Sequence, residues 1–261
     1  MQIIDTHAHY DDKAFDGDRD EILSSLPSHG VICCINVGAS IEGAKESIRL
    51  AEKYDHVYAA CGIHPDDTGY FEDRKDMSDP LEEIRALASH PKCVAIGEIG
   101  LDYHWMVQSK EVQQYWFAIQ LELALEADRP INIHSRDAAQ DTFDMVKQYH
   151  GHDGRGIIHC FSGSAQMARE YVKMGYHLGI GGVVTYKNGR VLKEVVSTIP
   201  IEYLVTETDC PYLAPAGHRG ERNYSGYLPI VVEEIARLKG METEEAAAIL
   251  YENARRVYRL P

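Results

Sequence analysis

The feature that most constrains the fold is a regular alternation of short apolar runs with segments of helical spacing. The runs are continuous rather than alternating in polarity, as is typical of parallel strands buried on both faces. Eight of them predict strands: Ile3–His7, Val31–Val37, Val57–Ile63, Val94–Ile99, Ile131–His134, Ile157–Cys160, His177–Val184 and Tyr203–Glu207. The intervening segments predict helices: Ser40–Tyr54, Asp79–Ser89, Lys110–Ala127, Ala138–Tyr149, Ala165–Met174, Gly189–Ser197, Leu228–Leu238 and Thr243–Val257.

Eight strand and helix units without a linker between them predict one α/β domain over residues 1–261, a single closed (β/α)8 TIM barrel. A doubly wound open sheet is the alternative. It would need a glycine-rich phosphate-binding turn after the first strand, where this chain has His7-Ala8-His9 instead. In a TIM barrel the active site forms at the C-terminal ends of the strands, so those ends are where functional residues are expected.

Metal-binding side chains stand at most of the predicted strand ends. His7 and His9 share one face of an extended strand, because successive side chains point to opposite faces. The other strand ends carry His64, Glu98, His134, His159 and Asp209. Any one of these histidines, taken alone, could be a hydrogen-bonded structural residue, and Glu98 and Asp209 could each cap a turn. Together they would crowd imidazoles and carboxylates at one barrel mouth, which favours a metal centre there.

The composition limits the classes of partner and location. With Lys+Arg 26 against Asp+Glu 41, the net charge of -15 repels polyanions and argues against tight, non-specific binding to duplex nucleic acid. No apolar stretch is long enough to span a membrane, and the first residues lack a signal-peptide pattern. Six cysteines without a CxxC pair predict reduced thiols in a cytoplasmic protein.

Six motifs in order carry a family resemblance: D-T-H-A-H, G-I-H-P, G-E-I-G-L-D-Y, I-H-S-R, H-C-F-S-G and E-T-D-C-P-Y-L. They resemble the TatD family of metal-dependent hydrolases, within the amidohydrolase-like barrels. The resemblance implies a two-metal deoxyribonuclease, often a 3′ exonuclease. It carries the metal ligands over to His7, His9, Glu98, His134, His159 and Asp209, and the substrate-binding residues to His64, Asp102 and Arg136.

One position departs from the family pattern. After Asn223 the family usually continues with Glu-Pro, whereas this chain has Tyr224-Ser225. We expect this change to alter the shape of the substrate site rather than the chemistry.

The expected ligands divide by strand order. His7, His9 and Asp209 come from neighbouring strands and suit one ion, while His134 and His159 suit a second. Glu98 can bridge the two with its two oxygens. The pair would make hydroxide available at neutral pH, with Asp209 accepting the proton of the water. Imidazole and carboxylate ligands are compatible with Zn²⁺, Mn²⁺, Fe²⁺ and Mg²⁺, so the ligand types do not decide which metal binds.

Three functions follow from this ligand set. The leading prediction is hydrolysis of phosphodiester bonds at DNA ends, because Arg136, Arg219 and Arg222 near the mouth suit phosphate. The alternative is a two-metal hydrolase of a small ester, lactone or amide. A binding scaffold without catalysis is disfavoured, because every expected ligand position is filled.

Overall fold

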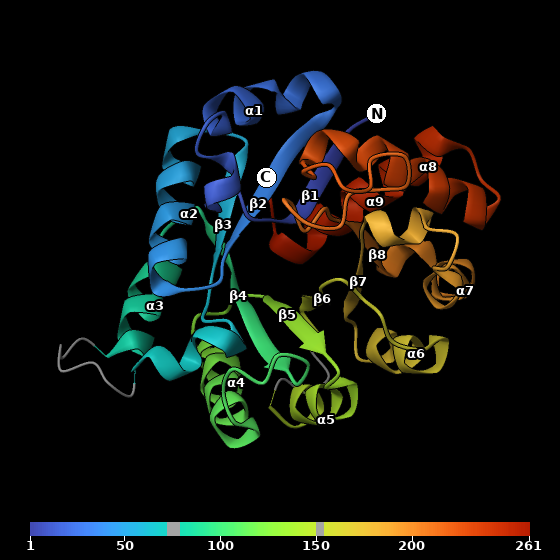
Figure 1. The fold of residues 1–261 in the computed structure, drawn as a ribbon. Coiled ribbons are helices and arrows are strands. Elements are labelled where there is room, and N and C mark those ends of the chain that lie inside the picture. The colour runs from blue at the N-terminus through green and yellow to red at the C-terminus, as the bar shows by residue number, and fades with distance from the viewer. Residues whose placement is uncertain (72–78, 150–153) are drawn as a thin grey trace.

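The strands form a parallel barrel surrounded by helices, which confirms the predicted fold (Figure 1). The computed structural model describes residues 1–71, 79–149 and 154–261. The sheet follows the chain order from β1 to β8. The strands are β1 (Ile3–Ala8), β2 (Val31–Gly38), β3 (Val57–Cys61), β4 (Cys93–Asp102), β5 (Ile131–Arg136), β6 (Gly156–Ile158), β7 (His177–Ile180) and β8 (Leu204–Thr206).

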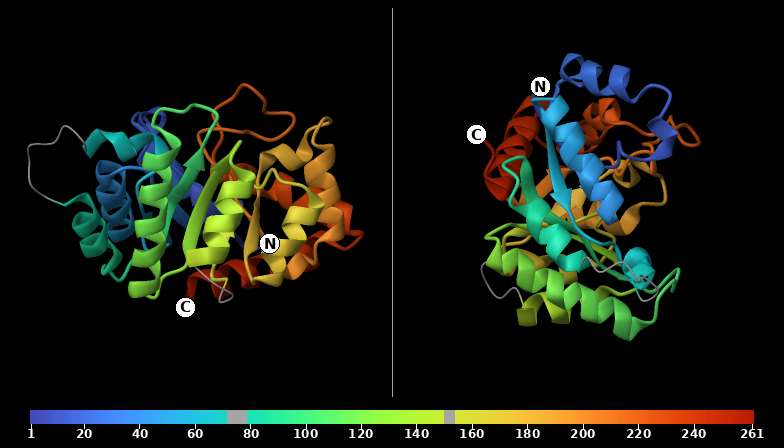
Figure 2. Two further views of the ribbon diagram at one scale, coloured as in Figure 1. Left: turned by 90° about the horizontal axis from the view of Figure 1, so that it is seen from below. Right: turned by 90° about the vertical axis from the view of Figure 1, so that its left-hand side faces the viewer.

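The helices pack around the outside of the barrel, and both views of Figure 2 show them flanking the strands. The α-helices are α1 (Arg19–Ser25), α2 (Ile41–Lys53), α3 (Pro80–Ala88), α4 (Lys110–Glu126), α5 (Ala139–Tyr149), α6 (Ala165–Lys173), α7 (Arg190–Thr198), α8 (Leu228–Lys239) and α9 (Thr243–Tyr258). Asp79 caps α3, because its side chain accepts a hydrogen bond from the Leu81 N–H, and Pro80 occupies the first turn. None of the helices in the described part of the chain is both long and apolar enough to cross a lipid bilayer.

Four predicted strands are shorter in the structure: β3, β6, β7 and β8. β6 ends at Ile158, and Cys160 has a φ of 43°, which interrupts the extended backbone, although the Phe161 N–H still donates to the Gly179 carbonyl of β7 at 3.1 Å. β7 ends at Ile180, and Gly182–Thr185 forms a 3-10 helix instead of continuing the strand. The short helix α1 was not predicted from the sequence.

The barrel closes between β8 and β1 with few backbone hydrogen bonds. The Asp209 N–H donates to the His7 carbonyl at 2.9 Å, and the His9 N–H donates to the Cys210 carbonyl at 2.9 Å. Deeper in the barrel, the Thr6 hydroxyl donates to the Thr206 carbonyl and the Thr206 hydroxyl donates to the Ile4 carbonyl. Threonine side chains therefore supply hydrogen bonds where the strands are too far apart for a regular ladder.

Helix α9 covers the N-terminal end of the barrel. Its residues Ala254, Val257 and Tyr258 are buried in one apolar cluster with strand residues such as Ile4 and Val205. The Tyr258 hydroxyl reaches the Thr6 carbonyl at 3.0 Å. The opposite end, where the strands finish, is left open to solvent and carries the functional residues.

Candidate metal centre

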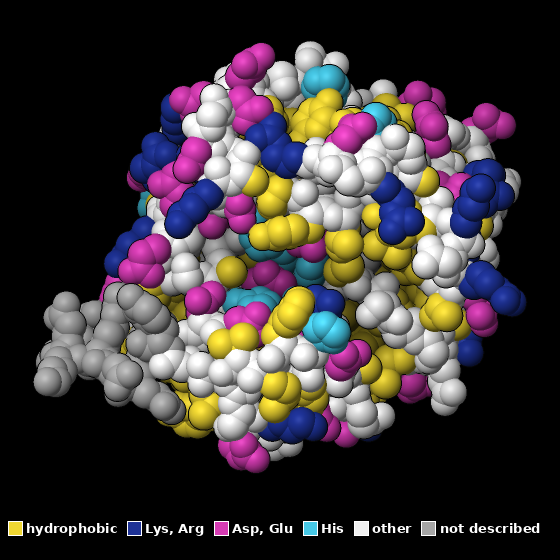
Figure 3. Space-filling view, in the orientation of Figure 1, with side chains coloured by type: hydrophobic (Ala, Val, Ile, Leu, Met, Phe, Trp, Pro, Cys, Tyr) yellow, Lys and Arg dark blue, Asp and Glu magenta, His cyan; other side chains and the backbone are white. Residues whose placement is uncertain are grey.

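All six predicted metal ligands meet at the C-terminal mouth of the barrel. His7 lies on β1, Glu98 on β4 and His134 on β5. His9 and His159 follow directly after β1 and β6, and Asp209 lies three residues after the end of β8. Figure 3 looks into this mouth, where histidine and acidic side chains line the floor of a hollow and hydrophobic side chains surround it. The ligand atoms fall into overlapping groups of three that are spaced closely enough to hold ions: His7/His9/Glu98, His7/His159/Asp209 and Glu98/His134/His159.

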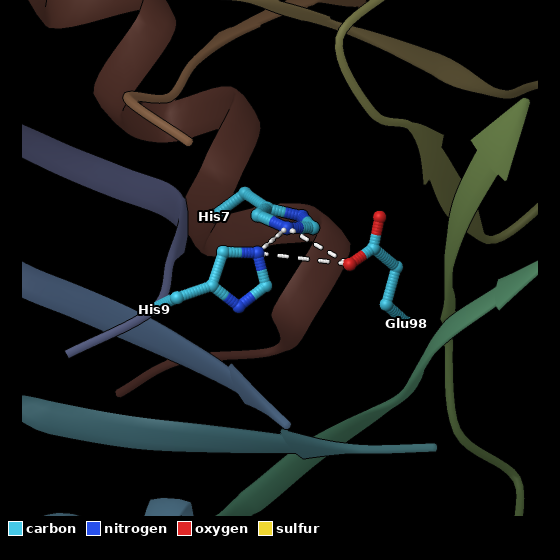
Figure 4. Close-up of side chains that lie close together, drawn as sticks. All are labelled: His7, His9 and Glu98. Atoms are coloured by element: carbon cyan, nitrogen blue, oxygen red, sulfur yellow. Dashed lines mark hydrogen bonds and ion pairs between the residues drawn. The ribbon is translucent and has the colours of Figure 1, made fainter. Parts of the chain in front are cut away.

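The His7 and His9 rings point at each other, with their Nε2 atoms 2.9 Å apart (Figure 4). His7 Nδ1 lies 2.9 Å from the Asn132 Oδ1, and His9 Nδ1 lies 2.8 Å from the Val37 carbonyl. Because both partners are acceptors, each Nδ1 carries a proton, and Nε2 is the ring atom that is left to bind an ion. Two ligands at right angles, each about 2.1 Å from one ion, would be about 3.0 Å apart. The pair therefore has the spacing of two ligands on one cation.

Glu98 presents a different oxygen to each half of the site. Its Oε2 lies 3.6 Å from the Nε2 atoms of both His7 and His9. Its Oε1 lies 2.9 Å from His134 Nδ1 and 3.8 Å from His159 Nε2. This carboxylate therefore stands between two groups of nitrogen ligands.

Asp209 also reaches both groups. Its Oδ1 lies 3.4 Å from His9 Nε2 and 3.7 Å from His159 Nε2. Burial opposes ionisation, but the His159, His9 and His7 rings hold the pKa of Asp209 below its usual value. It is therefore a carboxylate at neutral pH.

The cluster of acids draws positive charge to the histidines. Burial alone would lower the pKa of His9, but Asp209 and Glu98 raise it to about 10. In the same way, Asp102 and Glu98 outweigh burial and raise the pKa of His134 to about 9. Positive charge is thus favoured at the point where the ligand atoms converge, as a cation site requires.

Two buried side chains hold the ligands from behind. Asn132 accepts from His7 as described above, and Glu207 Oε1 lies 3.1 Å from His159 Nδ1. Glu207 is fully buried and also accepts the Cys160 N–H at 2.5 Å. Carboxylates and amides in such positions fix the orientation of metal-binding imidazoles. Neither residue was predicted from the sequence, although Glu207 stands two residues before Asp209 and so shares its face of an extended chain.

Asp102, expected on the substrate side, is buried against His134. Its Oδ2 lies 3.1 Å from His134 Nε2, and its Oδ1 accepts the N–H groups of His104 and Trp105. Although burial opposes it, the contact with His134 and these two N–H groups lower the pKa of Asp102 to about 2. In this position the carboxylate orients His134.

The other two expected substrate residues line the site. The His64 ring packs edge-on against His134, with ring centroids 4.5 Å apart. Burial lowers the pKa of His64 to about 4, and its Nδ1 accepts the Asp66 N–H at 3.2 Å, so the neutral ring carries its proton on Nε2. Arg136 is exposed, its guanidinium lies 5.3 Å from the centre of the Trp105 ring, and it has no ion-pair partner among the described residues.

A cleft of about 430 Å³ opens beside the ligands. His134, His159 and Asp209 form its inner end, and Arg136 lies on its wall. The remaining wall is mostly apolar and includes Phe161, Val183, Val191, Leu192 and Leu213. A molecule in this cleft would place a polar group against the ligands and an apolar group against the wall.

Two residues that the sequence connected with substrate have other contacts. Arg222 pairs with the Asp18 carboxylate through both terminal nitrogens, at 2.9 and 2.5 Å, so its guanidinium is occupied. Ser225 is fully buried and donates to the Asp5 carboxylate at 2.6 Å. The Tyr224-Ser225 departure therefore places Ser225 in a buried network beneath the β1–β8 closure rather than at the rim.

Comparisons with known proteins agree on one family. Residues 4–259 match the family described as TatD related DNase. The chain is 42% identical over 259 residues to an uncharacterised metal-dependent hydrolase, YabD, of Bacillus subtilis, and the match covers 99% of both chains. It is 36% identical to an uncharacterised metal-dependent hydrolase, TatD, of Mycobacterium tuberculosis, covering 99% of this chain and 98% of the other. The crystal structure of YjjV, a TatD homologue from Escherichia coli, matches with a TM-score of 0.87 at 31% identity, covering 99% and 98% of the two chains.

Proposed function

This chain belongs to the TatD-related DNase family of metal-dependent hydrolases, and we propose that it cleaves phosphodiester bonds at DNA ends with two divalent ions held at the barrel mouth. The observation that carries the proposal is the division of the Glu98 oxygens between His7/His9 and His134/His159. One ion would be held by His7, His9, Glu98 and Asp209. The other would be held by His134, His159 and Glu98.

The ions would lower the pKa of a shared water towards neutrality and stabilise negative charge on the reacting oxygens. Among the protein groups, the ionised Asp209 is placed to accept the proton of that water. His64 Nε2–H and the Arg136 guanidinium are donors for phosphate oxygens. Glu207, Asn132 and Asp102 keep the histidine rings in place while this happens.

Arg136 favours a phosphate over a carbonyl substrate. A guanidinium in a cleft, without a carboxylate partner in the described part of the chain, suits two oxygens of a phosphodiester. The second candidate remains hydrolysis of a small ester, lactone or amide. The apolar wall formed by Phe161, Val183 and Leu213 favours it, because such a wall accepts an uncharged acyl group as readily as a nucleobase.

One experiment separates the two candidates. The purified protein is subjected to elemental analysis and then assayed on bis(p-nitrophenyl) phosphate, p-nitrophenyl acetate and end-labelled single-stranded DNA. We expect two divalent ions per chain and turnover of both phosphodiesters. Arg136→Gln should lower kcat/KM for the phosphodiesters about tenfold or more. The exposed Arg169 on α6 gives a matched control, Arg169→Gln. Turnover of the acetate ester alone would contradict the proposal.

We also propose that the protein acts in the cytoplasm. All six of its cysteines are free, and five of them are buried, as suits a reducing compartment. Labelling of thiols in protein taken directly from cells and unfolded in denaturant, before and after reduction, tests this. Fewer than six free thiols before reduction would contradict it.

A further inference from the structure

A second hollow, with two basic side chains, lies next to the cleft. It has a volume of about 550 Å³, and its lining includes Lys187, Asn188 and Arg219. Asn188 also lines the cleft that leads to the metal ligands, so the two spaces adjoin. Both walls of the hollow are loops that follow strand ends β7 and β8, on the same end of the barrel as the metal centre.

The basic groups of this hollow are not neutralised by the protein. Lys187 and Arg219 are exposed, and neither forms an ion pair within the ranges that the structure describes. The nearest acid along the chain, Glu221, is already engaged by His218 at 2.8 Å and by the Tyr227 hydroxyl at 3.0 Å. In a chain with 41 acidic and 26 basic residues, two neighbouring cations without carboxylate partners are a local reversal of charge.

The hollow is also held in shape. The Arg219 guanidinium lies 4.6 Å from the centre of the Tyr186 ring, and the Tyr186 hydroxyl donates to the Ala214 carbonyl at 2.7 Å. Thr185 joins the same two loops, because its hydroxyl accepts the Ala216 N–H at 2.7 Å. A guanidinium stacked on a fixed ring loses less freedom on binding an anion than a free side chain does.

We propose that this hollow binds a second, non-scissile phosphate of a nucleic-acid strand whose end lies in the cleft. The inference rests on the proposed function, since the cleft must hold a phosphodiester for the strand to continue past Asn188. A basic groove that follows the backbone is the usual way to hold a single strand without reading its sequence. Lys187 and Arg219 thus select a polynucleotide over a small phosphodiester, and they act on binding rather than on cleavage.

The test compares a substrate that reaches the hollow with one that cannot. Wild-type protein loaded with Mn²⁺ and the double variant Lys187→Gln/Arg219→Gln are assayed on a pentathymidylate and on bis(p-nitrophenyl) phosphate. The control is Lys147→Gln/Arg169→Gln, which removes two exposed positive charges from α5 and α6. Fluorescence anisotropy of a labelled pentathymidylate, measured over a salt series, reports binding independently of turnover.

We expect the double variant to raise KM for the pentanucleotide about tenfold, with kcat and the small diester little changed. The slope of log Kd against log salt should also become shallower, by about 0.7 for each phosphate that the variant no longer neutralises. The inference is overturned if KM for the pentanucleotide does not change in the double variant, or if it rises as much in the control variant. It is also overturned if the double variant loses as much activity on the small diester as on the pentanucleotide. Wild-type protein that cuts neither substrate would instead refute the proposed function. If it still binds the pentanucleotide, anisotropy with the double variant decides whether the hollow binds phosphate.

Discussion

The two oxygens of Glu98 face different histidines, and this gives a prediction at the scale of single residues. Glu98→Ala should lose both ions, because the carboxylate serves both groups of ligands. His134→Ala should mainly weaken one ion. Elemental analysis after gel filtration, together with metal titration of both variants, checks this. Retention of two ions by Glu98→Ala would rule out a bridging carboxylate.

Asp209 gives a second prediction at this scale. In Asp209→Asn the amide oxygen still reaches the His9 and His159 side of the site, but the side chain no longer accepts a proton. Metal content should be largely kept, whereas kcat should fall about 10²-fold or more. Steady-state kinetics on bis(p-nitrophenyl) phosphate and elemental analysis together test this. Activity within a few-fold of wild type would show that Asp209 is not the proton acceptor.

The sequence predicts the residues that project into the mouth better than the residues that support them. His7 and His9 follow from strand alternation, and Glu98 and His134 follow from their places at strand ends. Asn132 and Glu207 act through contacts with residues far away in the chain, and such contacts depend on barrel packing that no local pattern encodes. The same reason explains Arg222, whose partner Asp18 is 204 residues away.

At the scale of elements, the closure between β8 and β1 depends on threonine hydroxyls. Thr206→Val keeps the side-chain shape but removes the hydrogen bond that the Thr206 hydroxyl donates to the Ile4 carbonyl across the closure. We expect a loss of about 1–3 kcal/mol in the free energy of unfolding, measured by urea denaturation. Thr198→Val is the matched control, because the Thr198 hydroxyl bonds within α7 near the surface. Equal losses in both variants would contradict the special role of the closure.

Strand β7 begins with a histidine that should make stability depend on pH. Burial and the Arg256 guanidinium lower the pKa of His177 to about 4. The folded state therefore binds fewer protons than the unfolded state between about pH 4 and pH 6.5. This contribution is present above about pH 6.5 and is lost as the pH falls towards 4.

The change that isolates this effect is His177→Gln, which removes the titration. Between about pH 7 and pH 4.5 the wild type should lose more stability than the variant, by up to about 3 kcal/mol. Urea denaturation at the two pH values measures the difference. Parallel losses in the two proteins would show that His177 does not titrate in this range.

Strand boundaries show where local patterns stop being sufficient. The apolar run from His177 to Val184 continues past the end of β7. Residues 182–185 leave the sheet as a 3-10 helix, and Val183 in this helix lines the cleft. Hydrophobicity alone cannot distinguish a buried strand from a buried turn. The order and number of strands could nevertheless be predicted, because a predicted helical segment separates each run from the next, except between the first two runs, where α1 was missed.

At the scale of the whole molecule, a net charge of -15 limits how nucleic acid can be held. The protein should bind strand ends through its metal site and a few phosphate contacts, so linear single strands should be cut far faster than circular ones. Its affinity should fall gently with salt, with a slope of about 0.7 for each phosphate contacted. Assays of linear and circularised oligonucleotides across a salt series measure both. Rapid cutting of circular strands, or a steep dependence of affinity on salt, would mean that the protein binds nucleic acid away from its ends.

The support beneath His7 comes from the other end of the chain. Asn132, which orients His7, donates to the Tyr258 hydroxyl at 3.0 Å, and Tyr258 also contacts the carbonyl of Thr6. During synthesis on the ribosome, His7 and His9 are made before the other four expected ligands, and β8 and α9 are made after all the other strands. The nascent chain therefore lacks the sixth expected ligand until Asp209 has been made, and the contact of Tyr258 with Asn132 is added later still. An ion that needs ligands from both β1 and the segment after β8 would therefore bind only after all eight strands have been made.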